Sequence, residues 1–455
     1  MFAPFDEPFD IEPVSTDPSI INSLETEPLT RRRFLTTAGQ GIAAAGMIGG
    51  LSSGTLAAQN PPAIAPGANT PIALPEISAP TETSHGKPPT PLPPDSRVRF
   101  AIVGLGHLSL EEILPAFAHS KRCRLTALVS GDRAKAETVA RQYGIAAKNI
   151  YDYKNYDSLR DNPEVDVIYI VLPNSMHAEY TVRGAQAGKH ILCEKPMATS
   201  VRECQQMIDA CRKADRRLMI AYRIQYEPYN YTMQQMLRGS EFGKVKVIEM
   251  INGQNQGGDL NQWRLKKALA GGGSLPDVGL YCLNTARFLT GEEPIEIVAH
   301  EYTTPNDPRF REVEETVNWT MRFPSGITAN CSTSYGFHEV RRYRVMGEQS
   351  WGQMDPAFSY SGLRQILGHK SRDNDMMEAV EERRMAEKNQ FALEMDHMAE
   401  CVQENKTPYT PGEEGLQDHR LMAAIYESGR SGRTVKLPPV TKQDAFRGTP
   451  PTRMI

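Results

Sequence analysis

The chain has few cysteines, and they follow no pairing pattern. Its 455 residues contain seven cysteines and ten histidines. Seven is an odd number, no two cysteines form a C-x-x-C pair, and no H-E-x-x-H pattern is present. These absences argue against a disulfide framework and against a zinc site. The sequence therefore predicts no bound metal ion.

An excess of charge of one sign is also missing. The 51 Lys+Arg nearly balance the 55 Asp+Glu, which gives a formal charge of −4 and leaves no basic surface for nucleic acid. Hydrophobic residues make up 40% and aromatic residues 7% of the chain. Those values are ordinary for a globular protein and exclude both wholesale disorder and a multi-span membrane protein. The composition suits a small-molecule enzyme of several domains.

An export signal is predicted at the start of the chain, over residues 1–58. Three consecutive arginines, Arg31 to Arg33, stand before an apolar stretch rich in glycine and alanine that ends near Leu56. This order is typical of a twin-arginine signal, which implies the twin-arginine translocase as a partner and a periplasmic location. A retained membrane anchor and a chance basic triplet before a core helix are the alternatives. Because that route carries folded proteins, it indicates a tightly held cofactor.

Residues 59–96 form a proline-rich segment, with eleven prolines between positions 59 and 95. Such a composition cannot form a packed core and predicts an extended arm. The arm is either a passive linker or a strap around a neighbouring subunit. Composition does not separate the two.

A dinucleotide-binding Rossmann domain is predicted over residues 97–222. An apolar strand at 98–103 runs directly into Gly104-Leu-Gly106, and a helical pattern and a second strand at 124–130 follow. Gly104 permits a tight turn, and Gly106 lets the backbone approach a pyrophosphate at the start of the helix. The third small position is Ser109.

The end of the second strand indicates which nicotinamide cofactor is bound. Positions 129–131 hold no acid to bond the ribose 2′-hydroxyl of NAD. Ser130, Arg133 and Lys135 offer a hydroxyl and two cations for a 2′-phosphate, which favours NADP. Asp132 keeps NAD open, and the two bases could also be a solvated helix face.

Further polar residues follow three more buried strands, at 165–172, 189–193 and 218–223. The carboxyl ends of parallel strands share one crevice, so residues there are predicted to bind the cofactor. His177 as a helix cap and Glu194 with Lys195 as a surface ion pair are the alternatives. The candidates at these strand ends, with one aromatic residue added, are Leu172, Pro173, Asn174, His177, Glu194, Lys195, Arg223 and Tyr153.

Two motifs carry a resemblance to a known family. Glu194-Lys195-Pro196 follows the Rossmann pattern, and residues 271–281 read G-G-G-S-L-P-D-V-G-L-Y. Together they resemble the glucose–fructose oxidoreductase / inositol dehydrogenase (Gfo/Idh/MocA) family. Within it the chain most resembles the periplasmic glucose–fructose oxidoreductases, which share the twin-arginine signal, the proline-rich arm and a tyrosine at the position of Tyr281.

The resemblance implies an α/β fold of two domains. Besides the Rossmann domain, it implies an α+β domain with a large, mostly antiparallel sheet over residues 223–437, followed by a tail at 438–455. Alternating apolar strands between 244 and 346 agree with that sheet. The sheet and the arm are expected to join copies into a homodimer or homotetramer.

The resemblance and the chemistry together predict a catalytic group of Lys195, Asp277 and Tyr281. Hydride transfer from a carbinol needs a base for the hydroxyl proton, and Tyr281 can be that base where an ammonium such as Lys195 stabilises its phenolate. Asp277 stands four residues before Tyr281, which places both on one face of a helix. A core tyrosine and a helix N-cap are the alternatives for these two residues. Trp263 and Arg264 are expected to contact sugar or cofactor.

The implied reaction is a ping-pong cycle in which NADP never leaves. One aldose is oxidised to its lactone, and a second sugar is reduced. A conventional NAD(P)-dependent sugar dehydrogenase is one alternative. A non-catalytic periplasmic sugar-binding protein is the alternative from another class.

Overall fold

A computed structural model describes residues 92–371 and 376–452. The described elements belong to one compact unit, residues 84–455. The signal and most of the proline-rich arm lie outside the described residues, so the expectations for them stay predictions.

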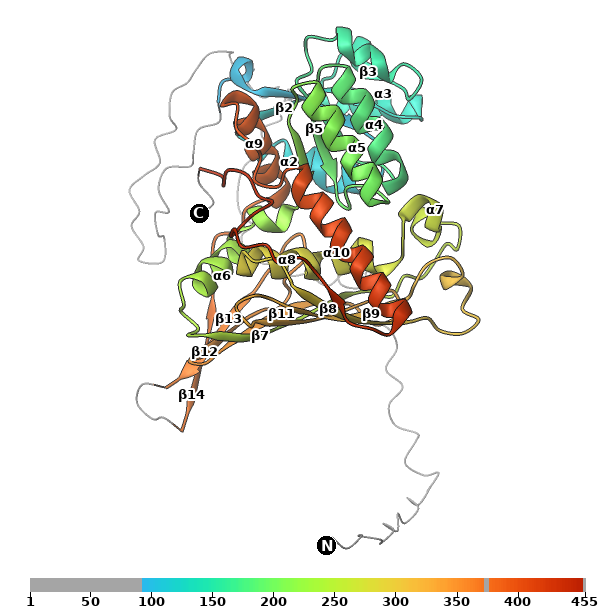
Figure 1. Ribbon diagram of the computed structural model, residues 1–455. Coiled ribbons are helices and arrows are strands. Elements are labelled where there is room, and N and C mark those ends of the chain that lie inside the picture. The colour runs from blue at the N-terminus through green and yellow to red at the C-terminus, as the bar shows by residue number, and fades with distance from the viewer. Residues whose placement is uncertain (1–91, 372–375, 453–455) are drawn as a thin grey trace, which may run out of the picture. The chain divides into compact units, whose positions relative to one another are not determined.

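The dinucleotide domain is built on a six-stranded sheet whose paired strands are all parallel, in the order β3-β2-β1-β4-β5-β6 (Figure 1). This is the doubly wound order, and its switch point lies between β1 and β4. The strands are β1 (Val98–Val103), β2 (Cys123–Val129), β3 (Ile150–Tyr151), β4 (Val167–Ile170), β5 (His190–Glu194) and β6 (Leu218–Ala221).

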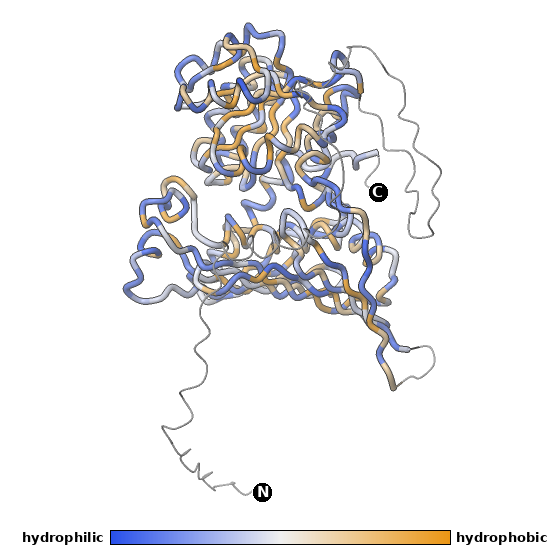
Figure 2. Tube along the Cα trace, turned by 180° about the vertical axis from the view of Figure 1, so that it is seen from behind, coloured by the Kyte–Doolittle hydropathy of each residue, from blue (hydrophilic) through white to orange (hydrophobic). Residues whose placement is uncertain are grey.

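The central strands are buried on both faces, which explains their continuous apolar runs. Phe100 to Val103 of β1 and all of β4 are fully buried, and Figure 2 shows the apolar residues gathered along this sheet. Helices and helical turns connect the strands. They are η2 (Pro94–Ser96), η3 (Ser109–Ile113), α2 (Leu114–Ala116), α3 (Arg133–Tyr143), η4 (Ala147–Asn149), η5 (Tyr156–Asp161), α4 (Asn174–Gln186), α5 (Val201–Lys213) and η6 (Arg223–Tyr226).

The second sheet has nine strands in the order β14-β13-β12-β11-β7-β10-β9-β8-β15. Its neighbours pair antiparallel except β7 with β10. The strands are β7 (Val245–Gly253), β8 (Glu296–Tyr302), β9 (Thr316–Arg322), β10 (Thr328–Ser334), β11 (Val340–Gly347), β12 (Ser350–Met354), β13 (Gln365–Lys370), β14 (Glu378–Arg383) and β15 (Val435–Lys436). The α/β class with a mostly antiparallel second sheet is confirmed.

Helices cover one face of this second sheet. Figure 1 shows α6 and α8 on the side that faces the dinucleotide domain, and no helix of the described residues covers the other face. The helical elements here are α6 (Pro228–Arg238), η7 (Trp263–Leu265), α7 (Lys267–Ala270), η8 (Leu275–Gly279), α8 (Leu280–Thr290), η9 (Pro308–Phe310), α9 (Gln390–Gln403) and α10 (Gly412–Ser431).

The last two helices return to the dinucleotide domain. Helix α10 packs on α5 and β6, and α9 packs on β1, β2 and β5. The Asp396 carboxylate in α9 accepts hydrogen bonds from the backbone N–H groups of Lys121 and Arg122. The C-terminal part of the chain therefore holds the two domains together. A single boundary at residue 223 does not describe this packing, because α9 and α10 follow that boundary and still contact the first domain.

The segment 366–390 carries no assignment from the sequence. In the structure β13 and β14 pair there as a hairpin at the edge of the sheet. No helix among the described residues is long and apolar enough to span a membrane.

Candidate active site

A cavity of about 710 Å³ lies at the carboxyl ends of the Rossmann strands. Strand ends and the turns after them form one wall, and the second domain forms the other. The wall formed by the Rossmann strand ends and the turns after them includes Gly104, Gly106, Ser130, Lys135, Tyr153, Leu172, Pro173, Asn174, Glu194, Lys195 and Arg223. The wall from the second domain includes Asn252, Gln254, Gln256, Trp263, Arg264, Asp277, Tyr281, Arg341, Phe358, Tyr360 and Phe391.

The glycine turn after β1 fits a dinucleotide. Gly104 has φ +96°, and a Cβ there would lie 2.2 Å from the carbonyl oxygen of Val171. At Gly106 a Cβ would meet nothing within 4 Å, so this position faces open space in the cavity wall. The Ser109 hydroxyl donates to the Gly104 carbonyl at 2.6 Å and fixes the turn. Gly104 is needed for packing, and Gly106 leaves the room that a pyrophosphate requires.

The residues after β2 divide into two groups. Ser130, Asp132 and Lys135 line the cavity, whereas Arg133 does not. The Arg133 guanidinium donates to the Ile150 carbonyl at 3.0 Å and pairs with Glu137. The Asp132 carboxylate accepts the Lys135 N–H and so caps α3. Of the two predicted phosphate-binding cations, only Lys135 reaches the cavity.

The loop after β4 is held by two buried side chains. Asn174 lines the cavity and donates to the Ala270 carbonyl at 2.8 Å. His177 lies behind the wall, where its ring nitrogens are 2.8 Å from the Leu172 carbonyl oxygen and 2.9 Å from that of Pro196. Burial lowers the pKa of His177. His177 thus joins the two strand-end loops and does not face the cavity.

Lys195, Asp277 and Tyr281 come together at one end of the cavity. The Lys195 ammonium donates to the Asp277 backbone carbonyl at 2.9 Å and lies 3.4 Å from its carboxylate. The same ammonium lies 4.7 Å from the centre of the Tyr281 ring. Burial acts to lower the pKa of Lys195, but Tyr281 and Asp277 outweigh it and the pKa is raised. Lys195 is therefore a cation held against the tyrosine.

Asp277 is surrounded by hydrogen-bond donors. Arg264 Nε lies 3.2 Å and the Tyr335 hydroxyl 2.7 Å from its Oδ2. Burial acts to raise the pKa of Asp277, but Arg264 and Lys195 outweigh it and the pKa is about 2. Asp277 lies inside the π-helical turn η8 and not at a helix N-cap. This carboxylate is an anion fixed between two cations.

The sequence predicts that Arg223 binds the cofactor, and the structure adds a second contact for it. It follows β6, is buried, and donates from Nη2 to the Tyr281 hydroxyl at 3.1 Å. A second bond from Nη2, to the Phe358 carbonyl at 2.6 Å, fixes the guanidinium. The group predicted to bind cofactor therefore also contacts Tyr281, the predicted catalytic tyrosine.

Several wall residues were missed by sequence reasoning. Gln254, Phe358 and Tyr360 line the cavity from loops that follow β7 and β12. Tyr335, just after β10, reaches the site through its bond to Asp277. The folding of the second domain brings these loops to the site, so no local pattern identifies them. Among the described residues, no group of His, Cys, Asp and Glu could hold a metal ion.

Residues 98–222 match the model of an oxidoreductase family with an NAD-binding Rossmann fold, and residues 234–437 match the C-terminal alpha/beta domain of the same family. The structure of an aldose-aldose oxidoreductase from Caulobacter crescentus, solved with glycerol, is 44% identical with a TM-score of 0.72, and the match covers 75% of this chain and 100% of that one.

Two curated relatives are sugar dehydrogenases by name. The D-xylose 1-dehydrogenase [NADP(+)] of Haloarcula marismortui is 29% identical over 75% of this chain and 94% of its own length. The D-glucoside 3-dehydrogenase of Escherichia coli is 24% identical over 75% of this chain and 98% of its own length. The matched domains and these identities confirm the resemblance seen in the motifs, and the chain belongs to the Gfo/Idh/MocA family of oxidoreductases.

Proposed function

We propose that the protein is an exported NADP-dependent sugar oxidoreductase that oxidises an aldose to its lactone and passes the hydride to a second sugar. The observation that carries this proposal is the meeting of Lys195, Asp277 and Tyr281 with a dinucleotide cradle in one cavity. A relative named as an aldose-aldose oxidoreductase supports sugars as both donor and acceptor.

The chain's own residues account for the acid–base part of the reaction. A bound nicotinamide supplies the hydride acceptor. Tyr281 takes the proton of the sugar hydroxyl, and the two cations beside it, Lys195 and Arg223, stabilise the oxygen that loses the proton. Asp277 holds Lys195 in place, because the Lys195 ammonium donates to the Asp277 backbone carbonyl at 2.9 Å. In the second half of the cycle Tyr281 returns the proton to the carbonyl oxygen of the acceptor sugar.

NADP is the proposed cofactor. Ser130 and Lys135 line the end of the cavity that follows β2, and the Asp132 carboxylate is engaged as the cap of α3. A hydroxyl and an ammonium suit a 2′-phosphate better than an acid does.

Export and retention of the cofactor form one argument. The periplasm supplies little free NADP, so an enzyme carried there by the twin-arginine route needs a cofactor that is bound before transport and regenerated in place. The signal and most of the arm lie outside the described residues, so their support comes from the sequence. Replacing Arg31 and Arg32 by lysine is expected to leave the protein in the cytoplasm, as measured by fractionation.

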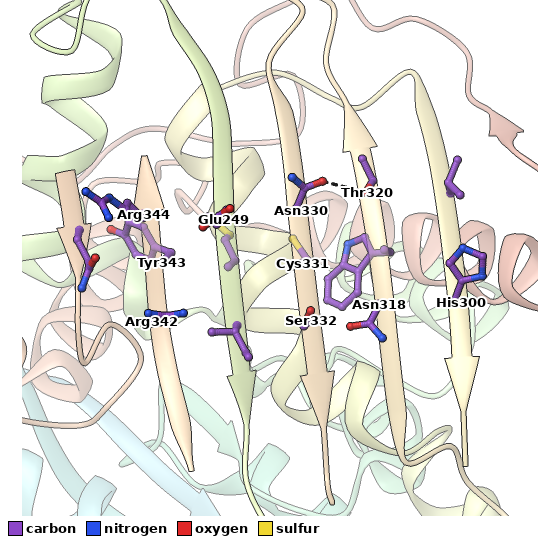
Figure 3. Close-up of a pocket in the computed structure, with 15 residues that line it drawn as sticks. Glu249, His300, Asn318, Thr320, Asn330, Cys331, Ser332, Arg342, Tyr343 and Arg344 are labelled. Carbon is purple, nitrogen blue, oxygen red and sulfur yellow. Dashed lines mark hydrogen bonds between the residues drawn. The ribbon is translucent and has the colours of Figure 1, made fainter. Parts of the chain in front are cut away.

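A second copy of the chain is the proposed cover for the open face of the nine-stranded sheet. Val298 and Tyr302 are 39% and 58% exposed there. Figure 3 shows side chains on neighbouring strands of this sheet, Glu249, Asn330 and Asn318 among them. These residues line a pocket of about 590 Å³. We expect sedimentation to show a homodimer or a homotetramer.

The absorbance spectrum of protein purified without added nucleotide tests the proposal. Glucose should produce the near-ultraviolet band of a reduced nicotinamide at one per subunit, and a second sugar should remove it. Protein that carries no nucleotide and turns over only with added NAD(P) would be a conventional dehydrogenase. Protein that binds sugar and neither forms the band nor turns over would be a binding protein.

A further inference from the structure

Three buried oxygen atoms form a chain behind the cavity wall. The Tyr169 hydroxyl in β4 lies 2.8 Å from Glu194 Oε1 at the end of β5. It also lies 3.0 Å from Glu394 Oε1 in α9. Tyr169 and Glu394 are fully buried, and Glu194 is 7% exposed and lines the cavity. These residues are hereafter the Glu194–Tyr169–Glu394 triad.

The two contacts of the triad require two protons. Each O···O contact at these distances is a hydrogen bond and needs one hydrogen between its oxygens. The phenol supplies one hydrogen, so the other must sit on a carboxyl group. Two ionised carboxylates around one phenol would also leave one buried contact without a donor, which is costly. The triad therefore holds one carboxyl proton at rest.

The surroundings assign that proton to Glu394. Glu194 Oε2 accepts the N–H of Lys195 at 3.2 Å. Burial raises the pKa of Glu194, and the charges of Lys195 and Arg223 act against that rise. Glu394 Oε2 has no hydrogen-bond partner. Burial raises the pKa of Glu394 well above its usual range, and the charge of Glu194 raises it further. The bonds then run in one direction, from neutral Glu394 through Tyr169 to anionic Glu194.

We propose that Glu194 takes up the proton released when a sugar is oxidised and holds it until the second sugar is reduced. This inference rests on the proposed function. The C–H hydride, with its two electrons, goes to the nicotinamide, and the O–H proton goes to Tyr281 and then, across the shared cavity, to the Glu194 carboxylate, where an O–H bond forms. Reduction of the second sugar reverses both transfers, so no proton enters or leaves over the cycle.

The change in charge on reduction explains why Glu194 would take up a proton. Reduction of a nicotinamide removes one positive charge from the cavity that Glu194 lines. Loss of that charge favours a neutral Glu194, because less positive charge then remains near the carboxylate. Tyr360 and Cys193 also interact with Glu194. Burial raises the pKa of both, that of Tyr360 to about 12, so both stay neutral. Glu194 is therefore the carboxylate in the triad that is free to accept a proton.

A single half-reaction in weak buffer tests the proposal. The holoenzyme is mixed with aldose, and nicotinamide absorbance and a pH indicator are followed together before the lactone hydrolyses, since hydrolysis also releases a proton. Wild type should reduce its nicotinamide and release no proton. Glu194→Gln should release one proton per nicotinamide reduced.

A second variant and a matched control keep the test decisive. Tyr169→Phe removes the donor that stabilises the Glu194 anion, so Glu194 is already protonated before sugar arrives, and one proton should again be released. Glu394→Gln replaces a neutral donor by another, and this variant should retain the proton. Infrared difference spectra should show a protonated carboxyl band on reduction in wild type and none in Glu194→Gln.

The outcomes separate the two proposals. If wild-type protein forms the absorbance band of the reduced nicotinamide and releases one proton, the proposed proton uptake by Glu194 is wrong and the proposed function remains intact. Proton release by Glu394→Gln with retention by Glu194→Gln would overturn the assignment of the storing carboxylate. If wild-type protein never forms the band of the reduced nicotinamide, the proposed function is wrong, and so is the proposed proton uptake by Glu194.

Discussion

Nη2 of Arg223 donates a hydrogen bond of 3.1 Å to the hydroxyl oxygen of Tyr281. The guanidinium carbon also lies 5.0 Å from the centre of the same ring, and the Lys195 ammonium lies 4.7 Å from it. Two cations from the turns after β5 and β6 therefore lie against one tyrosine of the second domain.

Replacing Tyr281 by phenylalanine removes the oxygen on which this arrangement converges. We expect kcat to fall by about 10²- to 10⁴-fold, the contribution of a positioned acid–base group. Nucleotide content and thermal stability should stay close to wild type, because the ring and its contacts remain. Tyr302→Phe, on the exposed sheet face, is the matched control and should keep kcat. An equal loss of kcat in both variants would remove Tyr281 from the mechanism.

The two glycines of the first turn give a paired prediction. A Cβ at Gly104 would lie 2.2 Å from a backbone oxygen, in a residue whose φ is +96°. Gly104→Ala should therefore lower the melting temperature strongly. Gly106→Ala meets no atom of the chain within 4 Å, so it should melt like wild type but carry less bound dinucleotide. Unchanged nucleotide content in Gly106→Ala would show that the cofactor does not approach this turn.

The parts of this protein that sequence reasoning predicted are those with local causes. The strand at 98–103 ends at a glycine that only a tight turn explains, and β1 has those bounds. Lys195, Asp277 and Tyr281 stand in two motifs, and the structure brings them together. A helical spacing of four residues was expected for Asp277 and Tyr281. The π-helical turn η8 runs directly into α8 at Leu280, so both residues lie in one helical run. Lys195 lies against both of them.

What sequence reasoning could not predict depends on tertiary packing. The direction of Arg133 is set by where α3 lies against β3, because its guanidinium binds the Ile150 carbonyl. Glu394 meets Tyr169 across 225 residues of sequence. In a single sequence, the patterns around Arg133 and Glu394 cannot be distinguished from those of a solvent-exposed helix face.

The C-terminal tail stabilises the fold through one buried arginine. Arg447 bonds Glu414 at 2.8 Å and Asp444 at 2.9 Å, and its side chain is 1% exposed. Arg447→Ala leaves charge in the interior without its partner and should lower the free energy of unfolding by about 3 kcal/mol. Arg433→Ala, at an exposed position, should change it by less than about 0.5 kcal/mol. Denaturant unfolding of both variants checks the prediction, and equal stabilities would contradict it.

Buried neutral histidines should make the protein lose stability in mild acid. Burial lowers the pKa of His419 to about 4, and burial together with Lys406 lowers that of His397 to about 3. In the unfolded chain both histidines have a pKa of about 6.5. Between these values the unfolded state binds more protons, so the free energy of unfolding falls as pH drops from about 6.5 towards 4, by up to about 1.4 kcal/mol per pH unit for each histidine.

A matched pair of variants tests this origin of the acid sensitivity. His419 Nε2 accepts the Ala198 N–H at 3.3 Å, and a glutamine oxygen can accept the same bond without titrating. His419→Gln should therefore flatten the decline of melting temperature between pH 6.5 and 4 without lowering stability at pH 7 by a comparable amount. His338→Gln, at an exposed position, should leave the decline as it is in wild type. A decline of the same steepness in all three proteins would contradict the assignment and would place the acid sensitivity in the carboxylates.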